Sequence, residues 1–170
     1  INTPAAINEK DLQLPQPVAT RNAMKFYRHD DLPTSRRGIW IARLKKGDTT
    51  WHEEHAVLND PAALRYSFNG EFPVVWWGDI KVGSDGSLIA GIYPGYFIDS
   101  TGTPTITSCI FFYRSIDNGH TWEILSRIVY PAKYPNGAAT YPGFTEPTFE
   151  MLKDGKFICV MRTTDDKNGP

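Results

Sequence analysis

The sequence predicts an all-β protein, and three observations support that fold class. Hydrophobic residues gather in short runs bounded by glycine, proline, asparagine and aspartate, which is the pattern of strands joined by turns. Between these runs there is no amphipathic helix of useful length. Two separate features also recur along the chain, at intervals of 71 and 69 residues, which indicates a repeated structural unit.

The first recurring feature is a tight turn between two strands. Residues 39–51 align without a gap with residues 110–122, and both copies end in Thr-Trp. In the later copy, Asp117 and Asn118 can hydrogen-bond the backbone ahead of them, and Gly119 supplies a positive φ. The earlier copy lacks the serine and the aspartate of this turn, so we interpret it as a degenerate version.

The second recurring feature is an Asp-Gly hairpin followed by a hydrophobic strand, at residues 85–93 and again at 154–162. Together the two features define one unit. Strand a enters the Asp-Gly turn, strand b leaves it, a longer loop leads to strand c, and the tight turn leads to strand d. Such a four-stranded antiparallel sheet is the blade of a β-propeller. Strands b and c are almost continuously apolar, as expected of sheets covered on both faces.

The predicted layout places blade one at about residues 15–60, blade two at about 70–132 and the start of blade three at about 143–170. The expected strands are 24–28, 38–44, 51–58, 74–82, 87–93, 107–114, 122–130 and the hairpin 144–162, with a linker at 59–69 and a loop at 94–105. Because two and a half blades would leave unpaired strand edges, we expect the remainder of the propeller beyond Pro170.

Composition argues against several classes of function. The 18 Lys and Arg residues balance 19 Asp and Glu residues, so neither a nucleic acid nor a membrane surface is an expected partner. No apolar run is long enough to span a bilayer, and no signal peptide is visible after Ile1. Cys109 and Cys159 lie within strand-like runs, which favours buried free thiols, and no spacing of ligands suggests a metal or a cofactor.

One pair of charged residues is placed symmetrically about a predicted turn. Glu146 and Arg162 lie eight residues to either side of Asp154. In the blade topology, the start of strand a and the end of strand b share one face, so the hairpin should bring this carboxylate and this guanidinium to the same rim. An ordinary cross-strand ion pair is the alternative, and charge alone favours it.

Two of these segments resemble a known family. Residues 115–122 match the Asp-box pattern S-x-D-x-G-x-T-W of the sialidase and BNR-repeat families, in which the box is a structural turn. Residues 145–162 resemble the sialidase segment that supplies two active-site groups. The resemblance implies a six-bladed sialidase-like β-propeller, in which Glu146 polarises a tyrosine nucleophile and Arg162 belongs to a triad that binds the substrate carboxylate.

A second segment, Arg28-His29-Asp30-Asp31, resembles the family loop that carries an arginine and then the acid/base aspartate. By position Asp31 is the better candidate for that acid/base and Asp30 the alternative; a solvated polar loop is an equally open interpretation. The Phe-Arg-Ile-Pro signature of the family is not found upstream of Arg28. The resemblance places the tyrosine nucleophile and the last triad arginine beyond Pro170.

Aromatic residues are expected at the same rim in blade two. At the offset of 69 residues, Trp77 corresponds to Glu146 and Tyr93 corresponds to Arg162. Their flat rings could stack on a sugar and so bind substrate, although packing between blades is the alternative.

The resemblance therefore implies a glycoside hydrolase similar to exo-sialidases, which would release a terminal acidic sugar with retention and whose partner is a carbohydrate. Two alternatives stay open: a propeller that binds glycans without cleaving them, and a related hydrolase or lyase acting on a neutral or uronic sugar. The family also implies an extracytoplasmic location.

Overall fold

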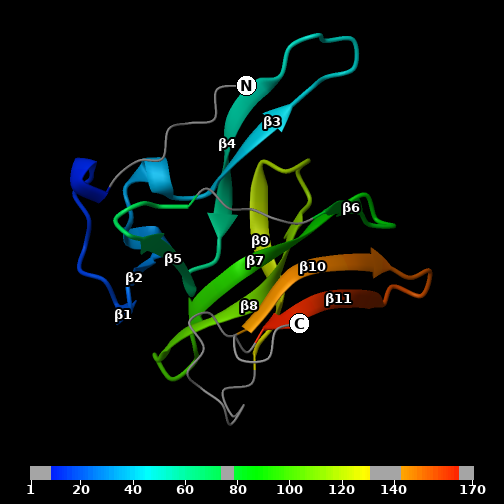
Figure 1. The fold of residues 1–170 in the computed structure, drawn as a ribbon. Helices are drawn as coiled ribbons and strands as arrows, with labels where there is room; N and C mark the ends of the chain where they lie inside the picture. The colour runs from blue at the N-terminus through cyan, green and yellow to red at the C-terminus, as the bar shows by residue number, and fades with distance from the viewer. Residues whose placement is uncertain (1–8, 74–78, 131–142, 165–170) are drawn as a thin grey trace.

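The computed structural model describes residues 9–73, 79–130 and 143–164, and this part of the chain is built of β-strands with three short 3₁₀ helices (Figure 1). The strands are β1 (Ala19–Arg21), β2 (Met24–Arg28), β3 (Ile39–Arg43), β4 (His52–Asn59), β5 (Ala63–Phe68), β6 (Ile80–Val82), β7 (Leu88–Ile98), β8 (Pro104–Ser115), β9 (Thr121–Ile128), β10 (Gly143–Met151) and β11 (Phe157–Thr164). The helices are η1 (Glu9–Asp11), η2 (His29–Asp31) and η3 (Thr34–Arg36). The all-β prediction is confirmed.

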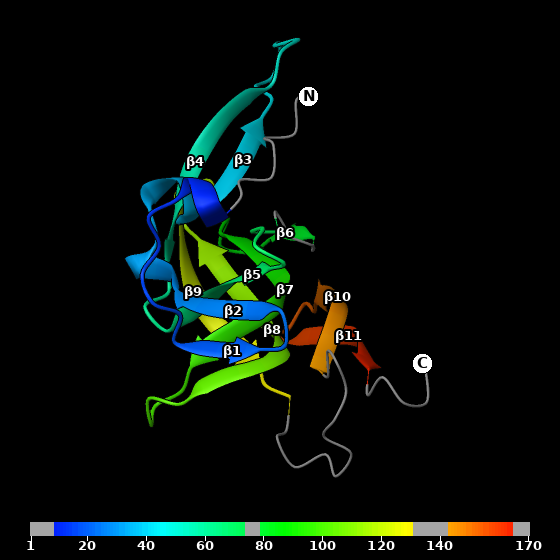
Figure 2. The same cartoon turned by 60° about the vertical axis from the view of Figure 1, so that its left-hand side comes forward.

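The strands form one open sheet around β7 and β8. Its order is β1-β2-β5-β7-β8-β9-β4-β3, while β6 pairs with β7, and β10 pairs with β11 and at one residue with β8. Figure 2 shows the β10–β11 hairpin as a separate layer beside β7 and β8. The closed ring of six blades stays a prediction, because the described strands form an open sheet.

Two predicted groups of strands are present. The strands β6, β7, β8 and β9 form a four-stranded antiparallel meander, as expected of blade two, although only residues 80–82 of the predicted strand 74–82 are seen as β6 and residues 74–78 lie outside the described part. β10 and β11 form the antiparallel hairpin expected at residues 144–162. The pairing within each of these groups therefore agrees with the repeat.

The turn at residues 115–122 is held by side chains. Ser115 Oγ accepts a hydrogen bond from Gly119 N at 2.8 Å, and Asp117 Oδ1 accepts one from Thr121 N at 2.9 Å. Gly119 has φ 91°, as predicted, and Trp122 Nε1 donates to the carbonyl of Gly119 at 2.9 Å. The serine, the aspartate and the indole thus all stabilise the turn, which makes its structural role explicit.

The second repeat is reproduced bond for bond. In the 83–87 turn, Gly83 N donates to the carbonyl of Ser87 at 2.7 Å, and in the 152–156 turn Leu152 N donates to that of Lys156 at 2.8 Å. The central glycines, Gly86 and Gly155, have φ 81° and 80°. The offset of 69 residues is therefore a structural repeat and not only a sequence pattern.

The predicted loop at residues 94–105 is wrong. β7 runs on to Ile98, and β8 begins at Pro104, so only residues 99–103 connect them. The pairing shifts on both sides of Gly95, which indicates bulges, and bulged positions tolerate the proline at 94. A side chain at Gly95 would lie 2.5 Å from the ring of Phe111, so only glycine lets the two strands approach here.

The predicted linker at residues 59–69 is also wrong, because it contains β5. Five residues of β5 pair with β2, from Met24 opposite Phe68 to Arg28 opposite Leu64, so β2 does not pair with β3 as a four-stranded blade one would require. The ring of Phe26 lies 5.0 Å from Tyr96 on β7 and 6.4 Å from Tyr66 on β5. This aromatic packing stabilises β5 between β2 and β7.

The core lies on both faces of β8. Cys109, Phe111 and Tyr113 pack on one face with Trp122 and with residues of β4, whereas Ile110 and Phe112 pack on the other. Because both faces are covered, the strand is apolar at successive positions, as its sequence indicated. Both cysteines are free; Cys109 is buried as expected, and Cys159 is partly exposed. Within the described residues, no helix has the length and apolar character needed to cross a bilayer.

Candidate functional site

Glu146 and Arg162 meet at one end of the β10–β11 hairpin, as the sequence predicted. Arg162 Nη1 donates a hydrogen bond to Glu146 Oε1 at 3.3 Å. The pairing follows one register from Met151 opposite Phe157 to the pair of Thr148 and Val160, and then shifts at a bulge. About half of each side chain, 54% for Glu146 and 46% for Arg162, is exposed. The pair is therefore accessible to a ligand.

The backbone at Glu146 adopts an unusual conformation. Its φ of 52° lies in the left-handed region, which costs an L-residue other than glycine about 1–2 kcal/mol. Glu146 lies inside the bulge of β10, just before Pro147, so the strand turns its side chain out of the ordinary alternation. Backbone strain of this kind is concentrated at binding and catalytic sites, which supports Glu146 as a functional residue.

Tyr93 of β7 completes this group. Burial and the negative charge of Glu146 raise the pKa of the Tyr93 phenol, and the positive charge of Arg162 partly offsets them. The phenol therefore stays protonated at neutral pH, where it can donate a hydrogen bond or present its ring to a sugar. We call Tyr93, Glu146 and Arg162 the rim cluster.

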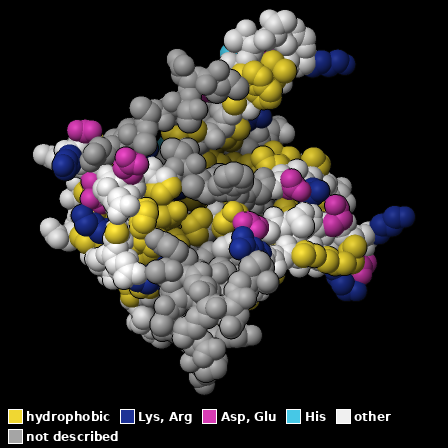
Figure 3. All heavy atoms as spheres, in the orientation of Figure 1, with side chains coloured by type: hydrophobic (Ala, Val, Ile, Leu, Met, Phe, Trp, Pro, Cys, Tyr) yellow, Lys and Arg dark blue, Asp and Glu magenta, His cyan; other side chains and the backbone are white. Residues whose placement is uncertain are grey.

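An apolar depression of about 540 Å³ lies beside the rim cluster. Its lining comes from β2, β5, β7, β8 and β10, and consists of Met24, Tyr66, Phe68, Pro73, Tyr93, Pro94, Tyr96, Ser108 and Thr145. Its volume falls within the range of small-molecule sites, about 300–1,000 Å³. Figure 3 shows hydrophobic side chains reaching the surface in the region of β2 and β5. The aromatic rings provide the flat surfaces on which sugars stack.

The sequence did not predict three of these rings. Tyr66 and Phe68 belong to β5, which was expected to be a linker, and Tyr96 belongs to the part of β7 that was expected to be a loop. The signal that could have identified the first two is the alternation in residues 63–68, where Leu64, Tyr66 and Phe68 fall on every second position.

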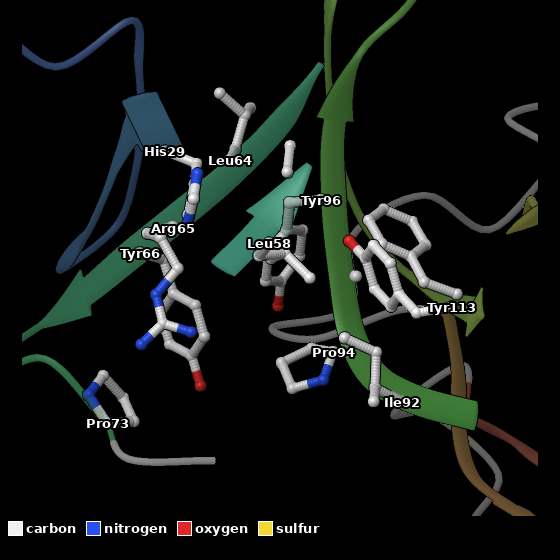
Figure 4. A pocket seen from close by; sticks show the side chains of 13 residues that line it. His29, Leu58, Leu64, Arg65, Tyr66, Pro73, Ile92, Pro94, Tyr96 and Tyr113 are labelled. Carbon is white, nitrogen blue, oxygen red and sulfur yellow. The ribbon is translucent and has the colours of Figure 1, made fainter. Parts of the chain in front are cut away.

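A narrower inner pocket of about 40 Å³ adjoins the depression, and the two share Tyr66, Pro73, Pro94 and Tyr96. Figure 4 shows its lining, with the guanidinium of Arg65 lying between His29 and Pro73 in this view. The inner pocket and the depression therefore lie on either side of these four residues.

The loop after β2 is organised by His29. Gly38 N donates to His29 Nε2 at 2.8 Å, so the other ring nitrogen, Nδ1, carries the hydrogen and donates to Asp30 Oδ1 at 2.9 Å. Burial lowers the pKa of His29, and the charge of Asp30 opposes that effect only in part. Asp30 therefore orients a neutral histidine, which leaves the exposed Asp31 as the better candidate for an acid/base.

The predicted site residues are only partly brought together. Glu146, Arg162 and Tyr93 form the rim cluster, whereas no hydrogen bond or ion pair in the described part of the chain joins Arg28, Asp30 or Asp31 to it. Trp77 lies outside the described residues. Among those that are described, no group of three His, Cys, Asp or Glu side chains is arranged to hold a metal ion.

Comparison with known proteins adds no family assignment to this geometry. No protein-family model, no curated protein and no solved structure matches the chain. The likeness to sialidases therefore depends on the sequence motifs quoted above.

Proposed function

We propose that this chain is part of a glycoside hydrolase resembling exo-sialidases, which releases a terminal acidic sugar with retention. The observation that carries the proposal is the contact between Glu146 and Arg162 beside an aromatic-lined depression. A guanidinium and stacking rings suit binding of an acidic sugar, and a carboxylate beside them can serve as the base for a nucleophile.

Each group would have a separate role. Arg162 contacts Glu146 through Nη1, so its other N–H donors could bind a substrate carboxylate. Glu146 would accept the proton of a tyrosine nucleophile supplied from outside the described residues, because a phenol with a pKa near 10 needs a base at neutral pH. A tyrosine suits an anionic substrate, since a carboxylate nucleophile would be repelled by it. Asp31 would act as the acid/base and Arg28 would assist binding.

A glycan-binding protein without catalysis is the second candidate, and one observation favours it. Glu146 and Arg162 already form an ion pair across the hairpin at 3.3 Å, so the pair can be a structural contact that needs no catalytic role. On this alternative, the same residues would bind a sugar but would not cleave it.

Turnover of a fluorogenic sialoside by the intact protein tests the proposal. We expect Glu146→Gln to lower kcat about 10²- to 10⁴-fold, because it removes the base. Arg162→Met should raise KM roughly 10- to 100-fold through the loss of charged hydrogen bonds. Glu150→Gln is the matched control, since Glu150 lies four residues along β10 and contacts Lys81 at 3.3 Å instead of the rim.

Two results would change the assignment. A parent protein that binds the sialoside without turnover would reject the hydrolase and favour the glycan-binding alternative. Cleavage of a neutral glycoside or a uronide in parallel assays, with the sialoside left intact, would indicate the related hydrolase or lyase.

A further inference from the structure

Arg65 places a positive charge inside the inner pocket without an anionic partner. Its side chain lines the pocket from the middle of β5 (Figure 4), and among the described residues no acceptor binds its guanidinium. Arginine stays protonated in proteins, so a partly buried positive charge lies in this pocket without a carboxylate partner among the described residues. Partial removal of such a charge from water has a free-energy cost that a bound anion would offset.

Arg36 of η3 adds a second unsatisfied guanidinium nearby. Its Nε and Nη2 atoms are buried and have no hydrogen-bond partner, and its Cζ lies 5.9 Å from the ring centre of Phe72. Phe72 directly precedes Pro73, which lines the inner pocket. Burial lowers the pKa of Arg65, and the positive charge of Arg36 lowers it further.

The acidic groups of this region have other partners. The buried carboxylate of Asp60 accepts a hydrogen bond from the Tyr113 hydroxyl at 2.8 Å and forms an ion pair with Arg127. Asp30 accepts the hydrogen bond of His29. The described anions near the inner pocket are therefore engaged elsewhere, which leaves Arg65 without a carboxylate partner among the described residues.

We propose that Arg65 forms an oxyanion-binding subsite in the inner pocket, which takes a carboxylate or a sulfate group of the ligand, and that the charge of Arg36 strengthens it from outside the pocket lining. A volume of about 40 Å³ exceeds the roughly 10–15 Å³ needed for one water and suits a group of a few heavy atoms. The rest of the ligand would occupy the adjoining depression. Only the identity of the ligand as a glycan depends on the proposed function.

This subsite is separate from Arg162. Arg65 lines the inner pocket, whereas Arg162 is not among its lining residues and contacts Glu146 at the rim. The two pockets would therefore offer positive charge at two places, one at the rim and one in the inner pocket.

The test measures thermal unfolding of the intact protein with sodium sulfate or sodium acetate, against sodium chloride at equal ionic strength. We expect at least one of the two oxyanions to raise Tm more than chloride does. Arg65→Met should weaken that anion's apparent affinity at least tenfold without lowering the Tm measured in chloride, because it removes an unpaired charge. Arg36→Met should weaken the affinity less. Lys153→Met, an equal change of charge in the exposed 152–156 turn, should keep the full response.

The opposite results would overturn the subsite. These are a parent protein with no oxyanion-specific rise in Tm, or an Arg65→Met protein that keeps the rise. If Arg65→Met fails to fold, Arg65→Lys serves instead and should retain charge but lose most of the affinity. Because sulfate also stabilises proteins without binding, the anion whose response Arg65→Met loses identifies the group. Since no turnover is involved, a protein that hydrolyses nothing can still support the subsite.

Discussion

Two turns 71 residues apart share their backbone path but differ in how their tryptophans are held. Both the 115–122 turn and the 44–51 turn join antiparallel strands and end in Thr-Trp. Yet Trp122 is 1% exposed and bonded to the Gly119 carbonyl, whereas Trp51 is 52% exposed. The path of the chain is repeated, but the anchoring of the indole is not.

The difference follows from two side chains. Ser115 and Asp117 bind the backbone of the later turn, and their counterparts at an offset of 71 are Leu44 and Lys46, which cannot accept such bonds. The 44–51 turn is instead connected to the 115–122 turn, because Arg43 Nη2, just before the former, donates to the carbonyl of Asn118 at 2.9 Å. The complete turn therefore helps to hold the degenerate one in place.

The largest expected contrast is between the two tryptophans. Trp122→Ala should lower the free energy of unfolding by about 3–5 kcal/mol, because it empties a fully buried site. Trp51→Ala should change it by less than about 0.5 kcal/mol, since its side chain is mostly in solvent. Denaturant titration of the intact protein measures both. Equal losses would show that the earlier indole is anchored as well.

A smaller contrast is expected at the first position of the turns. Ser115→Ala should lower the free energy of unfolding by about 1–3 kcal/mol, because it leaves the buried N–H of Gly119 without its acceptor. Leu44→Ala should change it by less than about 0.5 kcal/mol, as Leu44 is 44% exposed. The same titration applies, and a loss at position 44 as large as that at 115 would contradict the comparison.

The smallest expected effect depends on pH. The hydrogen bond from Thr121 N, and then that from Ser115, lower the pKa of Asp117 from 3.8 to about 2. Because the folded form has the lower pKa, this contribution to stability is complete above about pH 4 and is lost as the pH falls toward 2. Asp117→Asn should therefore flatten the decline of Tm over that interval, while Lys46→Met should not.

A second carboxylate, that of Asp85, also contributes to the decline of Tm between pH 4 and pH 2. The hydroxyl and then the backbone N–H of Ser87 lower the pKa of Asp85 to about 2 as well, so the double variant with Asp85→Asn should be flatter still. A curve for Asp117→Asn that coincides with the parent's from pH 4 to pH 2 would show that the turn carries no such linkage.

Much of the strand pattern could be predicted because local sequence determines hairpins. The turn at Gly119 and the paired turns at Gly86 and Gly155 fixed the meander and the third hairpin, and with them the contact between Glu146 and Arg162. What local sequence cannot specify is which hairpins pair with each other. β5 was missed because its alternation covers only Leu64, Tyr66 and Phe68, and because its partners lie far away along the chain.

The site shows the same limit. The rim pair lies within one hairpin, so symmetry about Asp154 predicted it, although the bulge at Glu146 shifted the register. The inner pocket is lined by side chains from the loop after β2, from β5 and from β7. Arg65 could therefore not be predicted as a pocket residue before these elements were placed together. The predicted closure into six blades depends on non-local pairing of the same kind.

Tyr66, Pro73, Pro94 and Tyr96 form a wall common to the inner pocket and the depression. A ligand that moves the ring of Tyr66 or Tyr96 in one pocket would change the space in the other. Binding in the two pockets would then be linked by a coupling free energy. By reciprocity, an anion bound beside Arg65 would change the affinity of a stacked sugar by the same factor by which the sugar changes that of the anion. Two fragments of one ligand, titrated separately and together, would therefore reveal a cooperativity that neither shows alone.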